Sequence, residues 1–108
     1  MLAAILESGE PTRLYTAFSL LGSTAAEGEA ARGLVSFGAL PALLREGDAD
    51  FEQLRDTAVE LPDLALHVCA AALAATGVDR AEAERRIGPV MSTPRFLRET
   101  AGARLVVV

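Results

Sequence analysis

The chain has 108 residues, of which 51% are apolar, and a formal net charge of −5. This length and composition suffice for one hydrophobic core, so we expect a single domain over residues 1–108. The acidic balance leaves no basic surface for a nucleic acid. All 10 cationic residues are arginine, which excludes a lysine that forms Schiff bases or binds phosphate in a P-loop.

The cysteine content and the N-terminal sequence indicate a cellular compartment. Cys69 is the only cysteine, so no intramolecular disulfide can form, which is typical of a reducing environment. Residues 1–6 carry no basic segment, and Glu7 follows too early for a signal peptide. The longest apolar run, 64–76, is too short to span a bilayer. We therefore expect a cytoplasmic protein that does not contact a membrane.

The first half of the chain alternates buried strands with helices. The predicted elements are a strand over 2–6, a helix from Pro11 to about 26, a strand within 31–40, a short helix over 41–44 and a helix over 51–61. Ser8 or Glu10 is expected to cap the first helix, and Asp50 the third. Gly38 marks a backbone turn or a close approach to a ligand. A break is predicted at Gly47-Asp48.

The second half continues the same alternation. The predicted elements are a strand over 64–68, helices over 70–76 and 80–87, a short strand over 88–91, a helix from Pro94 to 101 and a strand over 104–108. Gly77 is expected to end the first of these helices and Asp79 to cap the second. Thr93 is expected to cap the last helix. Its inward positions are predicted to be Phe96, Leu97 and Ala101.

The alternation of strands and helices defines the expected fold class. It predicts an α/β protein with a five-stranded parallel sheet covered on both faces, which is a three-layer α/β/α sandwich. The strands are continuous apolar runs, as burial on two faces requires. For five such units we expect the flavodoxin-like strand order 2-1-3-4-5, with strands numbered along the chain.

Cys69 stands where the predicted third strand meets a helix. The free N–H groups and partial positive charge of a helix N-terminus stabilise a thiolate, so Cys69 is the candidate catalytic residue. The carboxyl ends of the other strands meet at the same edge of a parallel sheet. The candidate pocket residues at this edge are Glu7, Ser8, Gly9, Phe37, Gly38, Met91, Ser92 and Thr93. The alternative is a buried cysteine that only fills space in the core.

His67 precedes the cysteine by two residues and shares its face of the strand. The two are about 6–7 Å apart along a strand, which is long for a hydrogen bond. We therefore favour a structural histidine, satisfied by the backbone, over a general base. One cysteine and one histidine do not supply a zinc site or a protease-like triad, so no metal is expected.

The segment Leu66-His67-Val68-Cys69, followed by Ala70-Ala71-Ala72, then Gly77-Val78 and Glu82-Ala83-Glu84, resembles the DsrE/DsrF-like family. The closest likeness is to sulfur-relay subunits of the TusD/DsrE type. These carry a cysteine at the end of a strand, an alanine-rich helix, a Gly-Val pair and an acidic capping segment. Where they typically have Arg-Arg before the Gly-Val pair, this chain has Ala75-Thr76.

The resemblance implies a DsrE-like α/β/α fold and an assembly into trimers, hexamers or hetero-oligomers. It also implies that Cys69 accepts sulfane sulfur as a persulfide from a donor protein and relays it to an acceptor protein, without a cofactor. A sulfurtransferase activity is the corresponding enzymatic expectation. The alternative is a non-catalytic subunit of the same fold that binds a small ligand or serves in assembly. A flavodoxin-like nucleotide binder is a third hypothesis, against which the missing phosphate-binding loop argues.

Overall fold

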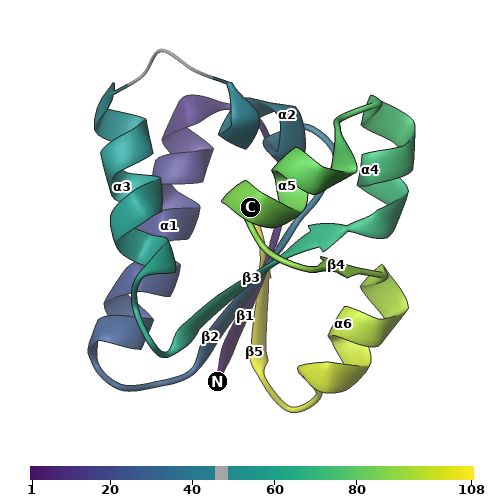
Figure 1. The fold of residues 1–108 in the computed structure, drawn as a ribbon. Coiled ribbons are helices and arrows are strands. Elements are labelled where there is room, and N and C mark those ends of the chain that lie inside the picture. The colour runs from purple at the N-terminus through teal and green to yellow at the C-terminus, as the bar shows by residue number, and fades with distance from the viewer. Residues whose placement is uncertain (46–48) are drawn as a thin grey trace.

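The structure is a computed structural model in which residues 1–45 and 49–108 are described. One five-stranded parallel sheet forms its centre (Figure 1). The strands are β1 (Leu2–Leu6), β2 (Ala31–Val35), β3 (Leu64–Cys69), β4 (Val90–Met91) and β5 (Arg104–Val107). The helices are α1 (Pro11–Ala26), α2 (Ala39–Leu44), α3 (Ala49–Val59), α4 (Ala70–Thr76), α5 (Arg80–Arg86) and α6 (Thr93–Glu99).

Helices cover both faces of this sheet, which confirms the predicted three-layer α/β/α sandwich. On one face, Leu21 of α1 packs near Leu66 of β3 and Leu6 of β1, around Gly33 of β2. On the other face, Phe96 of α6 lies against His67 of β3. Figure 1 shows α1 and α3 together on one side of the strands, α6 on another, and α2, α4 and α5 grouped at the end away from the N-terminus.

The strand order is β4-β3-β2-β1-β5, so the expected order 2-1-3-4-5 is wrong. The first four strands are added in one direction, and the chain then returns through α6 to place β5 on the far side of β1. Gly33 explains the packing at the centre of this order. A Cβ at residue 33 would lie 2.8 Å from Leu66 Cδ2 of β3, 3.4 Å from Leu6 Cδ1 of β1 and 3.2 Å from Leu21 Cδ1 of α1. Leucines from both neighbouring strands and from α1 therefore occupy that space.

The predicted helix caps at three positions are confirmed. The Glu10 carboxylate accepts hydrogen bonds from the N–H groups of Thr12 and Arg13, both at 3.1 Å. The Asp79 carboxylate accepts one from the N–H of Glu82 at 3.0 Å. Gly77 has a φ of 68°, a left-handed conformation that residues with a Cβ rarely adopt. Side chains and glycine therefore end these helices as the local sequence predicts.

Two boundaries in the first half differ from the predictions. The second strand ends at Val35, and α2 begins at Ala39, because the carbonyl of Ser36 accepts hydrogen bonds from the N–H groups of residues 39 and 40. The helix α3 already begins at Ala49, so Asp50 lies inside it and is not its cap. The predicted break at Gly47-Asp48 lies outside the described residues.

The last helix differs in its cap and in its inward positions. Its cap is Ser92, whose hydroxyl accepts a hydrogen bond from the N–H of Arg95 at 3.3 Å, and not Thr93. Phe96 is fully buried as predicted, but Leu97 is 43% exposed and Ala101 is also exposed. Leu97 directly follows Phe96, so its side chain points about 100° away from the buried one around the helix axis. Ala101 lies beyond the end of the helix at Glu99.

None of the helices in the described part of the chain is long and apolar enough to cross a membrane.

We predict that Gly88→Ala destabilises the protein. A Cβ at residue 88 would collide with the backbone carbonyl of Leu66. The backbone is held close at this point, because the carbonyl of Pro89, which leads into β4, accepts a hydrogen bond from the N–H of Val68. Overpacking of this kind costs about 1–3 kcal/mol, measured as the free energy of unfolding in urea. Gly22→Ala is the matched control, because its Cβ would meet only Leu61 Cδ1 at 3.9 Å. Alanine within α1 is expected to stabilise by about 0.5–1 kcal/mol. An equal loss in both variants would contradict the packing argument.

Candidate functional site

Cys69 ends β3 and directly precedes α4, as the sequence predicts. It has the extended backbone conformation of a helix cap, with φ −66° and ψ 123°. Its side chain lies on the same face of the sheet as α6 and is only 1% exposed. The candidate nucleophile is therefore at the carboxyl edge of the sheet but beneath the surface.

Hydrogen-bond donors surround the sulfur of Cys69. The thiol Sγ lies 3.6 Å from the hydroxyl Oγ1 of Thr93, at the start of α6. Burial, the largest single influence, raises the pKa of the thiol. The N–H of Ala72, the hydroxyls of Thr93 and Ser36 and the N–H of Ala71 act in the opposite direction, and together they lower the pKa below its usual value. The site therefore stabilises the thiolate more than the environment of a free cysteine does.

Ser36 is the member of this site that the sequence did not indicate. It follows β2 and is 5% exposed. It reaches the cysteine because β2 and β3 are neighbours that end in register, with Val35 paired to Val68. The expected order 2-1-3-4-5 would have separated these strands. A polar residue directly after each buried strand is the signal that could have found it.

The candidate pocket residues fall into two groups. The first group lies beside the cysteine. Met91 ends β4 and is the register partner of Cys69, and Ser92 and Thr93 follow β4. Of these, Thr93 contacts the thiol and Ser92 caps α6, while Met91 is buried.

The loops after β1 and β2 form the second group. Glu7 accepts a backbone hydrogen bond from Ala39 at 3.2 Å, and a Cβ at Gly9 would lie 2.5 Å from the carbonyl oxygen of Gly38. These backbones are packed together with no room for a ligand between them at that point. The hydroxyl of Ser8 accepts a hydrogen bond from the N–H of Glu10, and the ring of Phe37 is 47% exposed.

His67 lies in a charged cluster beneath α6. The guanidinium of Arg32 donates a hydrogen bond to Nε2 of the imidazole at 2.9 Å and another to the carboxylate of Glu99 at 3.1 Å. Since Nε2 accepts, the proton of the neutral ring is on Nδ1, which is buried without a hydrogen-bond partner among the described residues. The expected structural role fits this geometry, but the partner is an arginine side chain and not the backbone.

The cluster keeps the imidazole neutral. Burial is the largest influence and lowers the pKa of His67, and the positive charge of Arg32 lowers it further. Arg95 acts in the same direction, while Glu99 opposes them. A protonated imidazole would have to give up the hydrogen bond that it accepts from Arg32.

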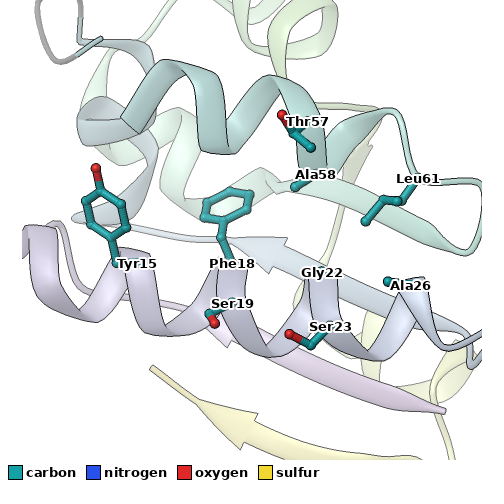
Figure 2. Close-up of a pocket in the computed structure, with 9 residues that line it drawn as sticks. All are labelled: Tyr15, Phe18, Ser19, Gly22, Ser23, Ala26, Thr57, Ala58 and Leu61. Atoms are coloured by element: carbon teal, nitrogen blue, oxygen red, sulfur yellow. The ribbon is translucent and has the colours of Figure 1, made fainter. Parts of the chain in front are cut away.

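An apolar groove of about 450 Å³ lies between α1 and α3 (Figure 2). The floor is the buried ring of Phe18 with Ala58 and Leu61, and small residues of α1 leave the space open. The lining residues are Tyr15, Phe18, Ser19, Gly22, Ser23, Ala26, Thr57, Ala58 and Leu61. The groove lies on the opposite face of the sheet from Cys69. The sequence did not predict this groove, although the small residues at helical spacing in α1 are a signal.

Within residues 1–45 and 49–108, no three histidine, cysteine, aspartate or glutamate side chains are grouped so that they could hold a metal ion.

Comparison with known proteins supports the fold. No family model matches the sequence, and no curated protein matches it. The structure is similar to that of MTH1491, a protein of unknown function from Methanobacterium thermoautotrophicum, with a TM-score of 0.70. The similarity covers 99% of this chain and 97% of that one at 15% sequence identity. At this identity the similarity concerns the fold alone.

We predict that Thr93→Val raises the pKa of Cys69, because valine has a similar shape but no hydroxyl to stabilise the thiolate. The ultraviolet absorbance of the thiolate, titrated against pH with Cys69→Ser as the blank, measures this pKa without requiring access to the sulfur. Thr76→Val is the matched control. Thr76 lies at the end of α4 away from Cys69, and its hydroxyl donates to the carbonyl of Ala72 and not to the thiol. An unchanged titration in Thr93→Val would contradict the assigned hydrogen bond.

We predict that stability falls as the pH drops below about 6.5, the ordinary pKa of histidine. The pKa of His67 is lowered in the folded protein, so the unfolded chain binds a proton more readily in this range. The stabilisation is present at pH values above the pKa that His67 has in the unfolded chain. It is lost as the pH falls through the lower pKa of His67 in the folded protein. Urea unfolding from pH 7.5 to 5 measures the effect, and His67→Gln, which cannot titrate, is expected to remove most of this slope. Carboxylates with lowered pKa, such as Glu99, respond only at lower pH. A slope that persists in His67→Gln would refute the assignment.

Proposed function

We propose that this protein carries sulfane sulfur on Cys69 and transfers it to a partner. The observation that supports the proposal is the group of hydrogen-bond donors around Sγ, which outweigh burial and lower the pKa of the thiol. A thiolate is the form that attacks sulfur. The same donors can stabilise the negative charge of a persulfide, because the outer sulfur that carries this charge is about 2 Å from Sγ.

The proposed transfer is an exchange between a thiolate and a persulfide, which requires no added oxidant or cofactor. The Cys69 thiolate attacks the outer sulfur of a donor persulfide, R–S–SH. The donor S–S bond breaks and its electron pair leaves on R–S⁻, while a new S–S bond gives Cys69–S–SH. An acceptor thiolate then attacks the outer sulfur in the same way and restores the Cys69 thiolate. The reaction class is that of a sulfurtransferase.

The family resemblance around residues 66–84 extends this proposal. It implies a DsrE-like protein of the cytoplasm, whose partners would be sulfur donor and acceptor proteins. It also favours an oligomer, either of identical subunits as a trimer or hexamer or together with related subunits. The α/β/α fold is compatible with this placement but is shared by many proteins with other roles.

Access to the sulfur is a requirement of the proposed step. Cys69 is 1% exposed, so a donor persulfide reaches Sγ only when a covering segment moves. The junction between β4 and α6, at Ser92-Thr93, is the segment to consider, because Thr93 is in contact with the thiol. Transient opening of this junction would admit a small donor, and docking of a partner at this edge would favour the open state.

A second candidate function is non-catalytic binding of a small ligand, with Cys69 as a core residue. The groove between α1 and α3 favours this candidate, because its volume of about 450 Å³ is in the range of ligand pockets. Its lining is apolar or hydroxylic and contains no charged side chain. The chemistry fits an uncharged and largely apolar ligand.

We predict that the wild-type protein gains one sulfur atom after exposure to a small sulfane-sulfur donor. Intact-mass spectrometry under native conditions measures the gain, which a thiol reductant reverses. Cys69→Ser is the control, and because Cys69 is the only cysteine the site needs no further mapping. Thr93→Val is expected to lower the rate at neutral pH, since less of the thiol is ionised. No gain in the wild type, together with alkylation of Cys69 only after unfolding, would exclude the carrier function and leave the binding candidate.

A further inference from the structure

The outer edge of β5 presents unpaired backbone groups. The N–H of Arg104 bonds to the carbonyl of Met1 at 3.1 Å and that of Val108 to Ile5 at 2.9 Å. Bonding residues alternate along a parallel strand, so the N–H and C=O groups of Leu105 and Val107 face away from the sheet. Within the described part of the chain, β5 pairs with β1 alone and ends the sheet. Backbone groups in such a row are satisfied by another extended strand.

The same two residues also expose apolar side chains. Leu105 is 48% exposed and Val107 is 59% exposed, whereas Val106 between them is partly buried against the core. They lie on the face of the sheet that α6 covers, because they pair in register with Ala3 and Ile5. However, Phe96 of α6 lies over β2 and β3, where it contacts Arg32 and His67. The short α6 therefore leaves the β5 side of this face uncovered.

The edge lacks the devices that normally prevent pairing. Exposed edge strands are usually blocked by a lysine, a proline or a charged side chain that points inward. Residues 105–108 are Leu-Val-Val-Val and contain none of these. Valine and leucine at such positions favour a strand partner.

We infer that β5 pairs with β5 of a second copy of this chain, antiparallel and about a two-fold axis at Val106. The outward backbone groups of Leu105 then bond to those of Val107 of the partner subunit, and the reverse pair forms by symmetry. The two sheets join into one continuous sheet. The exposed leucine and valine of each copy meet across the axis and bury one another.

The charges at the two ends of the edge favour the antiparallel direction. Arg104 stands at one end of β5, where it forms an ion pair with Glu29 at 2.8 Å. Glu29 also contacts the amino group of Met1 at 3.1 Å, so this end has two positive groups for one carboxylate. At the other end, the carbonyl of Val108 accepts hydrogen bonds from the N–H groups of Glu7 and Ser8 at 2.8 and 3.2 Å, which places the acidic Glu7 there. Antiparallel pairing brings the arginine end of one copy to the glutamate end of the other, at both ends of the interface. Parallel pairing would set arginine beside arginine.

Disulfide trapping tests the register. In a Cys69→Ser background, Val106→Cys is expected to give a cross-linked dimer on mild oxidation, since residues on the axis form a close pair, with Cα atoms about 4.5 Å apart. Leu105→Cys and Val107→Cys are matched controls. Both side chains are more exposed than that of Val106, so random collision between molecules would cross-link these variants faster than Val106→Cys. In the proposed register neither residue lies opposite its own copy in the partner subunit, so neither variant is expected to cross-link. Faster linking of either control would overturn the proposal.

Sedimentation over a range of protein concentrations tests the interface itself. The wild type is expected to form dimers, and Leu105→Lys with Val107→Lys is expected to weaken the dimer at least tenfold while the circular dichroism stays unchanged. Leu20→Lys is the control, because Leu20 has a similar exposure of 42% on α1. A monomeric wild type, or a dimer lost only in Leu97→Lys or Leu20→Lys, would refute the proposal. The test is independent of the sulfur chemistry, because Cys69→Ser is expected to dimerise equally.

Discussion

The position of β2 between β1 and β3 is the constraint on which the rest of the structure depends. It is possible because Gly33 has no side chain, so that Leu66, Leu21 and Leu6 fill the space where a Cβ would stand. This packing fixes the direction in which the first strands are added. It also brings the end of β2 next to the end of β3, and with it Ser36 next to Cys69. The electrostatic character of the thiol thus follows from a contact deep in the core.

Local features of the fold could be predicted from the sequence, while the order of the strands could not. The caps at Glu10 and Asp79 and the left-handed Gly77 depend on residues within one turn of the chain, and these predictions are confirmed. Which strands are neighbours depends on packing between residues 30 or more positions apart, such as Gly33 and Leu66. Continuous apolar strands carry no pattern that distinguishes one order from another.

The candidate site shows the same division. Cys69 at the joint of strand and helix follows from local sequence, but its partners do not. Thr93 is free to contact the thiol because Ser92, and not Thr93, caps α6. The arginine that bonds His67 comes from the neighbouring β2. The groove between α1 and α3 depends on the distance between two helices, which the small residues of α1 permit but do not specify.

The late return of the chain to β1 has a consequence for synthesis on the ribosome. The β1–β5 ladder joins residues 2–5 to residues 104–107, so one side of β1 has no partner until almost the whole of this sequence has been made. A nascent chain that already contains β1 to β4 therefore has an open edge along β1, which is an interior strand of the complete sheet. Contacts so distant in sequence form slowly, and an open central strand invites association between unfinished chains. The order of the strands therefore leaves the edge of an interior strand open for most of the time that this sequence takes to be synthesised.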